Sequence, residues 1–176
     1  MSRCLIALGS NLGDRLGQLR AAVDALQGLD HCVVRQVSGL YETAPVGGPD
    51  QQPAFLNAAL QLDTAIAPTG LLAALHRIEA EHERERNVRW GPRTLDLDLL
   101  TYADLVNEDA AMQLPHPRMH LRRFVMVPVC DIDPDTRHPK LGLTMRALCD
   151  ALPVEPDDLT LVNQHWIDVE NRRTTE

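Results

Sequence analysis

The chain has 176 residues, 44% of them hydrophobic, and a formal net charge of −8, so it can form one ordinary domain whose core needs neither disulfides nor a structural metal. The acidic balance argues against a general nucleic-acid binder, because most of the surface would repel a phosphate backbone. The sequence has no run of roughly twenty apolar residues and no signal-peptide core, and its 4 cysteines lack CxxC spacing, so we expect a cytoplasmic protein with free thiols and no membrane partner.

The first half of the chain predicts three β segments and one helix. Residues 3–10 predict a strand, and residues 13–27 predict a helix with apolar residues at helical spacing, namely Leu16, Leu19, Val23 and Leu26. Residues 31–42 are rich in β-forming side chains and end at the loop 43–53, whose prolines and glycines cannot continue a ladder. Residues 54–64 predict the next strand.

The second half predicts further helices and one strand of alternating pattern. Residues 68–85 predict a helix, and residues 95–103 predict a strand. Residues 121–132 fit either an apolar strand or a helix that contains Pro128; we expect the helix. Residues 143–152 predict a final short helix. The order β, α, β, β, α, β predicts a ferredoxin-like α+β sandwich, in which helices cover one face of a largely antiparallel sheet.

The end of the chain differs from the rest in composition. Beyond Leu152 it becomes acidic and contains prolines, and it ends in NRRTTE. We therefore expect a single, monomeric domain over residues 1–152 and a loosely held C-terminal tail over residues 153–176. Trp166 could dock this tail locally.

Two aspartates stand out in the strand predicted over residues 95–103. Its leucines face one side and Asp96 and Asp98 face the other, with about 6.5 Å between same-side positions, so the two carboxylates can converge. A solvated strand face explains an isolated DLD equally well. Two like charges side by side repel each other, however, and a cation would relieve that repulsion. Oxygen ligands of this kind suit magnesium, which takes one or two carboxylates together with substrate phosphates.

Arginines gather just before that strand. The chain has 17 basic residues, all arginines apart from Lys140, and the segment RERNVRWGPR holds Arg84, Arg86, Arg89 and Arg93. A basic pocket in an acidic protein suits a small polyanion, since guanidinium groups match phosphate oxygens two at a time. Ion pairs with nearby glutamates explain Arg84 equally well. They explain Arg93 less well, because the Gly-Pro turn holds it close to the carboxylates.

Several aromatic and polar residues complete the candidate set. Trp90 beside Gly91 is either a core anchor or a lid over a ligand. A flat heterocycle could stack between Phe55 and Phe124 or between either of them and Trp90, and the amide of Asn57 could pair with its ring edge. His116, between two prolines, either makes a local structural contact or acts on a ligand, by donating to a phosphate or by assisting proton transfer.

Four motifs together closely resemble the 6-hydroxymethyl-7,8-dihydropterin pyrophosphokinase family of folate biosynthesis. They are ALGSNLGDR, YETAPVGGPDQQPAFLNAA, RWGPRTLDLDLL and LPHPRMHLRRFVMVP, and they span roughly residues 1–150. The resemblance implies a ferredoxin-like fold and an enzyme that transfers the β,γ-diphosphate of ATP to the pterin hydroxymethyl group and releases AMP. It also implies two Mg²⁺ ions held by Asp96 and Asp98.

The same resemblance implies roles for the other candidate residues. Phe55 and Phe124 correspond to the pair that sandwiches the pterin, and the residues that read the pterin edge are Asn57 and the stretch with Thr43, Pro45 and Val46. The positions that handle ATP are Glu79, Arg84, Arg86, Arg93, His116 and Arg122. Trp90 corresponds to the mobile catalytic loop, and the residues with catalytic roles are Asp96, Asp98, Arg84, Arg93, Trp90 and His116.

The sequence departs from the family pattern at a few positions and leaves other functions open. Ala44 stands where some members have proline, and Ala111 where some have a further arginine. The alternatives are a metal-dependent phosphohydrolase, with His116 or His120 assisting a water nucleophile, and a non-catalytic nucleotide-binding paralogue. Neither alternative explains why aromatic, amide and paired carboxylate positions occur together.

Overall fold

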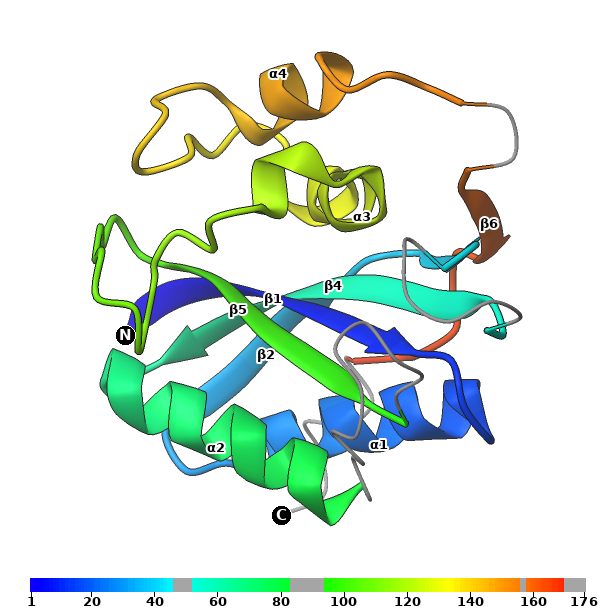
Figure 1. Ribbon diagram of the computed structural model, residues 1–176. Helices are drawn as coiled ribbons and strands as arrows, with labels where there is room; N and C mark the ends of the chain where they lie inside the picture. The colour runs from blue at the N-terminus through cyan, green and yellow to red at the C-terminus, as the bar shows by residue number, and fades with distance from the viewer. Residues whose placement is uncertain (46–51, 83–93, 156–157, 170–176) are drawn as a thin grey trace.

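The computed structural model describes residues 1–45, 52–82, 94–155 and 158–169. In this part of the chain a single sheet lies between two layers of helices (Figure 1). No helix among these residues is long and apolar enough to cross a bilayer.

The sheet is antiparallel at every strand pair that the described residues form. Its strands are β1 (Ser2–Ser10), β2 (Cys32–Val37), β3 (Leu40–Thr43), β4 (Phe55–Thr64), β5 (Asp96–Tyr102) and β6 (Thr160–Asn163). Their order is β5-β1-β4-β3-β6, and β2 also pairs with β4. β4 is the central strand: the whole of β1 pairs with one edge of β4, and β3 and β2 pair with its other edge. These pairings confirm the predicted α+β fold with a mostly antiparallel sheet.

The β-rich segment predicted over residues 31–42 forms two strands, β2 and β3, rather than one. Ser38 and Gly39 separate them. At this point the Ser38 hydroxyl accepts the N–H of Ala59 at 2.9 Å, which replaces a ladder carbonyl. A serine side chain that competes with the backbone in this way interrupts a strand.

The helices are α1 (Arg15–Gln27), α2 (Pro68–Glu81), α3 (Arg123–Ile132) and α4 (Met145–Asp150), with a 3₁₀ turn over Met119–Leu121. α1 begins at Asp14, whose carboxylate accepts the N–H of Gly17 at 3.0 Å. Residues 121–132 form a helix as expected, although Pro128 inside it cannot donate to the Phe124 carbonyl.

The helices cover both faces of the sheet, whereas we expected them on one face. α1 and α2 lie on one side and α3 and α4 on the other (Figure 1). The reason is that the central strands are apolar on both faces. Ile6 and Leu8 of β1 join the core under α1 and α2, while Leu5 and Ala59 join a second core under α3 and α4.

The tail expected to be loosely held is attached to the domain through its described residues. β6 pairs with β3. Trp166 is 2% exposed, its indole N–H donates to the Ser38 carbonyl at 2.8 Å, and its own carbonyl accepts two bonds from Arg20. Asp158 pairs with Arg123, the first residue of α3, at 2.8 Å. The expectation rested on composition, which carries no information about a free strand edge or a pocket elsewhere in the fold.

Candidate functional site

The strand register places the predicted acceptor and metal residues in one row across the sheet. Asn57 of β4 lies opposite Gly9 of β1, and Gly9 lies opposite Asp96 of β5. Two residue pairs further along, Ala7 lies opposite Asp98. Adjacent strands are about 4.8 Å apart, so Asn57 and Asp96 stand about 10 Å apart across Gly9.

Both aspartates point to the face of the sheet that α3 and α4 cover further along. Leu97 and Leu99 belong to the core under α1 and α2, whereas Leu100 belongs to the other core. Because side chains alternate along a strand, Asp96 and Asp98 share the face of Leu100. Both are half-buried. The DLD pattern is therefore not simply a strand face exposed to water, because both carboxylates are partly covered by protein.

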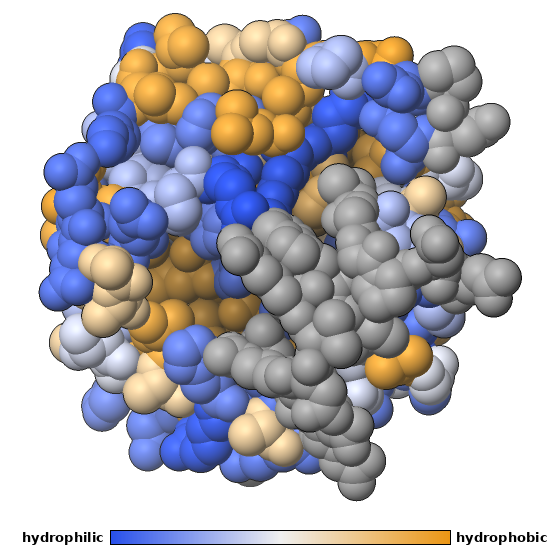
Figure 2. Space-filling model, in the orientation of Figure 1, coloured by the Kyte–Doolittle hydropathy of each residue, from blue (hydrophilic) through white to orange (hydrophobic). Residues whose placement is uncertain are grey.

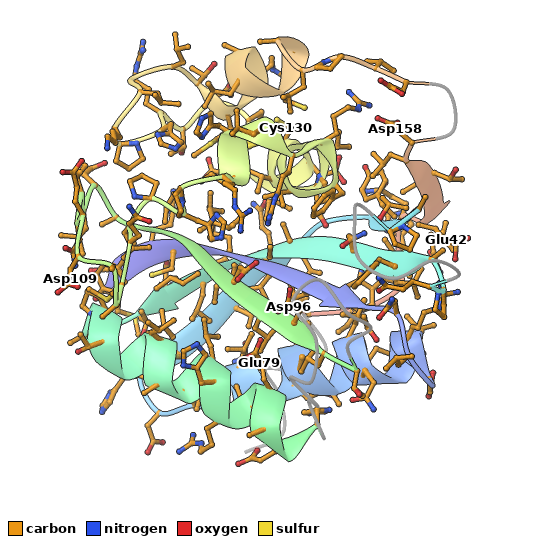
Figure 3. All side chains as sticks on the ribbon, viewed as in Figure 1. Glu42, Glu79, Asp96, Asp109, Cys130 and Asp158 are labelled. Carbon is orange, nitrogen blue, oxygen red and sulfur yellow. The ribbon has the colours of Figure 1, made fainter. Side chains whose placement is uncertain are left out.

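The backbone between these aspartates is held by a buried glutamate. Glu79 of α2 is 1% exposed and accepts the N–H of Leu97 at 2.8 Å. Figure 3 shows Glu79 on the α2 side of the sheet and Asp96 at the start of β5. Since β5 is an edge strand, its outward N–H needs such a partner. Glu79 thus fixes the strand that carries both carboxylates, and its contact with nucleotide remains a prediction.

Removing this acceptor should destabilise the protein measurably. Glu79→Leu leaves the buried Leu97 N–H without its carboxylate partner, so we expect the free energy of unfolding to fall by about 1–3 kcal/mol. Glu79→Gln keeps an acceptor oxygen of the same reach, so its free energy of unfolding should fall distinctly less. Urea denaturation of both variants measures the difference. Equal stability of the leucine variant and the wild type would show that the bond contributes nothing.

His116 is oriented by the backbone around it. The backbone N–H of His116 donates to the Leu100 carbonyl at 2.8 Å, and its ring Nδ1 accepts the backbone N–H of Arg118 at 3.2 Å. This bond assigns the proton of the neutral ring to Nε2. Burial lowers the pKa of His116 below its usual value; the carboxylate of Asp98 opposes that shift, and the positive charges of Arg122 and Arg118 add to it. The neutral ring can therefore donate from Nε2 near Asp98.

The residues predicted to bind the acceptor ring lie on the same face. The Asn57 amide donates to the Thr43 hydroxyl at 2.8 Å, and both side chains are buried. Phe55 starts β4 on this face, and α3, which carries Phe124 near its start, packs against β4. The guanidinium carbon of Arg122 lies 5.6 Å from the centroid of the Phe124 ring. An amide and two aromatic rings thus approach one side of the sheet.

Gly9 is a site residue that the sequence reasoning did not single out. A Cβ added there would lie 3.4 Å from Asn57 Oδ1, 3.9 Å from the Asp96 Cβ and 3.9 Å from Phe55 Cδ1. The glycine therefore separates the amide and the aromatic ring on one side from the carboxylate on the other. Its signal in the sequence was the motif ALGSNLGDR, which carried the resemblance but no assigned role.

A cavity of about 290 Å³ opens beside Asp98 at the edge of β5. Its lining includes Leu72 and His76 of α2, and Ala111, Leu114 and His116 from the segment after β5. Figure 2 shows an apolar hollow on this side of the molecule, bordered by hydrophilic residues. Ala111 adds only a methyl group to this lining, whereas Asp98, Gln113 and His116 make other parts of it polar.

Some predicted site residues lie outside the described part of the chain. They are Val46, Arg84, Arg86, Trp90 and Arg93. Among the described residues, no three His, Cys, Asp or Glu side chains form a cluster that could hold a metal by themselves. The carboxylate pair Asp96 and Asp98 offers only oxygen atoms, the donor set that magnesium shares with substrate phosphates.

Comparisons with known proteins agree on one family. The family profile described as 7,8-dihydro-6-hydroxymethylpterin-pyrophosphokinase matches residues 5–134. The chain is 43% identical over 155 residues to a 2-amino-4-hydroxy-6-hydroxymethyldihydropteridine pyrophosphokinase of Pseudomonas aeruginosa, covering 88% of this chain and 94% of the relative. It is 47% identical over 127 residues to the protein of that name in Bacillus subtilis, covering 72% and 75%.

A solved structure shares the fold. A Plasmodium falciparum HPPK-DHPS chain superposes with a TM-score of 0.68 at 15% sequence identity. The alignment covers 85% of this chain but only 43% of that longer protein. At this identity the likeness supports the architecture alone.

Proposed function

This chain belongs to the 7,8-dihydro-6-hydroxymethylpterin-pyrophosphokinase family, and from that premise we propose which of its residues perform the reaction. The enzyme is an ATP-dependent diphosphotransferase of folate biosynthesis, and its acceptor is a 6-hydroxymethyldihydropterin. The acceptor hydroxyl oxygen attacks the β-phosphorus, and the bond from that phosphorus to the oxygen it shares with the α-phosphate breaks. AMP leaves with the electron pair, and the hydroxyl loses its proton. Positioning and charge neutralisation dominate such a transfer.

The acceptor ring binds on the sheet face that carries Asn57. The Asn57 amide, held by its bond to Thr43, reads the ring edge together with the backbone through Pro45 and Val46. Phe55 and Phe124 stack on the two faces of the ring. The hydroxymethyl group then points across Gly9 toward Asp96, because Gly9 contributes no side chain between them.

ATP binds on the other side of the aspartates. The adenine base of ATP occupies the cavity beside Asp98, where Leu72 and Leu114 supply apolar surface. His116 donates from Nε2 to a phosphate oxygen, and the positive charge of Arg122 stabilises the negative charge of that phosphate. Arg84, Arg86 and Arg93 hold the migrating diphosphate, with Trp90 over the reacting groups, as the family resemblance implies. Glu79 supports this side by holding β5.

Two Mg²⁺ ions fit the carboxylates of Asp96 and Asp98. Both side chains are half-buried on one face, and their oxygen-only donor set is the one magnesium uses with phosphates. When bound there, the ions would neutralise phosphate charge and polarise the acceptor hydroxyl. The observation that carries the whole assignment is the row Asn57, Gly9, Asp96 across three adjacent strands. We further propose a monomeric cytoplasmic enzyme that acts on small molecules, with neither nucleic acid nor a membrane as partner. Its catalytic and binding residues lie within residues 1–152, and the segment with β6 and Trp166 completes the same domain.

Product analysis and metal counting test this assignment. With ATP, Mg²⁺ and 6-hydroxymethyl-7,8-dihydropterin, AMP and the pterin diphosphate should appear in equal amounts, and neither should form when EDTA removes the metal. A phosphohydrolase would release AMP or ADP without pterin, and a non-catalytic paralogue would bind ATP without turnover.

The metal assignment has its own readout. Mn²⁺ titration of the enzyme with a non-hydrolysable ATP analogue, followed by electron paramagnetic resonance, should give two bound ions for the wild type. A variant carrying both Asp96→Asn and Asp98→Asn should bind fewer. Equal binding by wild type and variant would place the metal elsewhere.

A further inference from the structure

Three polar side chains between the end of β1 and the start of α1 donate to backbone carbonyls of distant segments. The Ser10 hydroxyl donates to the Thr94 carbonyl at 2.6 Å, and the Asn11 amide donates to the Pro53 carbonyl at 3.2 Å. Ser10 is 0% exposed and Asn11 is 1% exposed. Polar side chains buried this completely must be committed to such partners.

Arg15, in the first turn of α1, extends the same set. Its guanidinium donates to the Ala54 carbonyl at 2.6 Å and pairs with the Glu42 carboxylate at 2.9 Å. Glu42 directly precedes Thr43 of β3 in the chain, and Ala54 directly precedes Phe55 of β4.

The carbonyls that accept these bonds lie just before the site residues Asp96 and Phe55. Thr94 precedes Asp96 by two positions, and it lies outside β5, whose ladder begins at Asp96. Pro53 and Ala54 likewise lie outside β4, which begins at Phe55. These bonds therefore fix the backbone just before β4 and β5, where the ladder hydrogen bonds do not yet hold it.

We propose that Ser10, Asn11 and Arg15 are positioning residues of the diphosphate transfer, which fix the acceptor side of the site against the carboxylate side. The inference rests on the proposed placement of the acceptor near Phe55 and of the metal at Asp96. Because Gly9 lies between these two sides, the residues that follow it can reach both: Ser10 bonds to the segment before β5, and Asn11 bonds to the segment before β4. A displacement of about 1 Å between reacting groups can cost roughly a hundredfold in rate.

The signature of this role is a loss of turnover without a loss of substrate binding. Ser10→Ala removes one donor and almost no volume, so the Thr94 carbonyl loses its bond to Ser10 while the ladder at Asp96 stays intact. We expect kcat to fall by about tenfold or more. The dissociation constants of the pterin and of a non-hydrolysable ATP analogue should stay within about threefold of wild type, since no residue that touches either ligand changes.

Asn11→Asp is a second, isosteric variant, because a carboxylate cannot donate to the Pro53 carbonyl. It should lower kcat in the same way. The matched control is Tyr102→Phe, which removes a hydroxyl that donates to a backbone carbonyl, that of Ile66 at 2.9 Å. Tyr102 is the last residue of β5, at the opposite end from Asp96, so kcat should stay near the wild-type value.

Melting temperatures of all variants separate positioning from general destabilisation. A kcat of Ser10→Ala as high as that of Tyr102→Phe would overturn the inference, and so would equal losses of kcat in both variants at equal losses of stability. A wild-type enzyme that forms no pterin diphosphate would instead overturn the proposed function. These two failures can therefore be told apart in one series of assays.

Discussion

Replacing Asp98 with alanine should reduce turnover by about three orders of magnitude or more while the fold stays largely intact. Asp98 provides one of two carboxylates on the face where we propose that the acceptor and ATP meet, and it lines the cavity together with His116. Its loss removes half of the charge that would hold cations on the phosphates. Groups that neutralise charge in phosphoryl transfer are worth this much in rate.

Steady-state assays of AMP release at saturating Mg²⁺ measure this effect. Asp98→Asn provides a variant of nearly unchanged shape, and Asp104→Ala provides a control, since Asp104 is an exposed aspartate just after β5. Circular dichroism and urea denaturation establish that each variant is folded. A near-normal rate for folded Asp98→Ala would refute the metal assignment.

Replacing Trp166 with alanine should lower the free energy of unfolding by about 3–5 kcal/mol, the range for truncation of a large buried aromatic side chain. Trp166 is 2% exposed, packs in the core that includes the α1 and α2 side chains, and donates to the Ser38 carbonyl. The change leaves a cavity and a carbonyl without its donor. A residue in a loosely held tail would show no such effect.

Two further variants make this prediction specific. Trp166→Phe keeps most of the apolar volume and loses the indole N–H, so it should lose clearly less stability than alanine. Leu161 also lies in the C-terminal segment, in β6, but its side chain is 49% exposed. Leu161→Ala should therefore change the free energy of unfolding by no more than about 0.5 kcal/mol. Thermal and urea unfolding of the three variants give the comparison. Equal stability of Trp166→Ala and Leu161→Ala would mean that the C-terminal segment does not stabilise the domain.

The sequence by itself determined the features that depend on local spacing. Strand alternation is a period of two, so it placed Asp96 and Asp98 on one side before any tertiary contact was known. Helical spacing located α1 and α2, and the long motifs identified the family. Each of these signals is contained within a short run of residues.

Tertiary structure alone decided which distant residues meet. Asn57, Gly9 and Asp96 stand in one row because of antiparallel register between strands far apart in the chain, and register is not encoded in any single strand. The role of Ser10 and Asn11 became visible only when their partners Thr94 and Pro53 were known. The segment around β6 has little local signal, because its strand residues are exposed and its stability comes from the β3 edge and the pocket that receives Trp166.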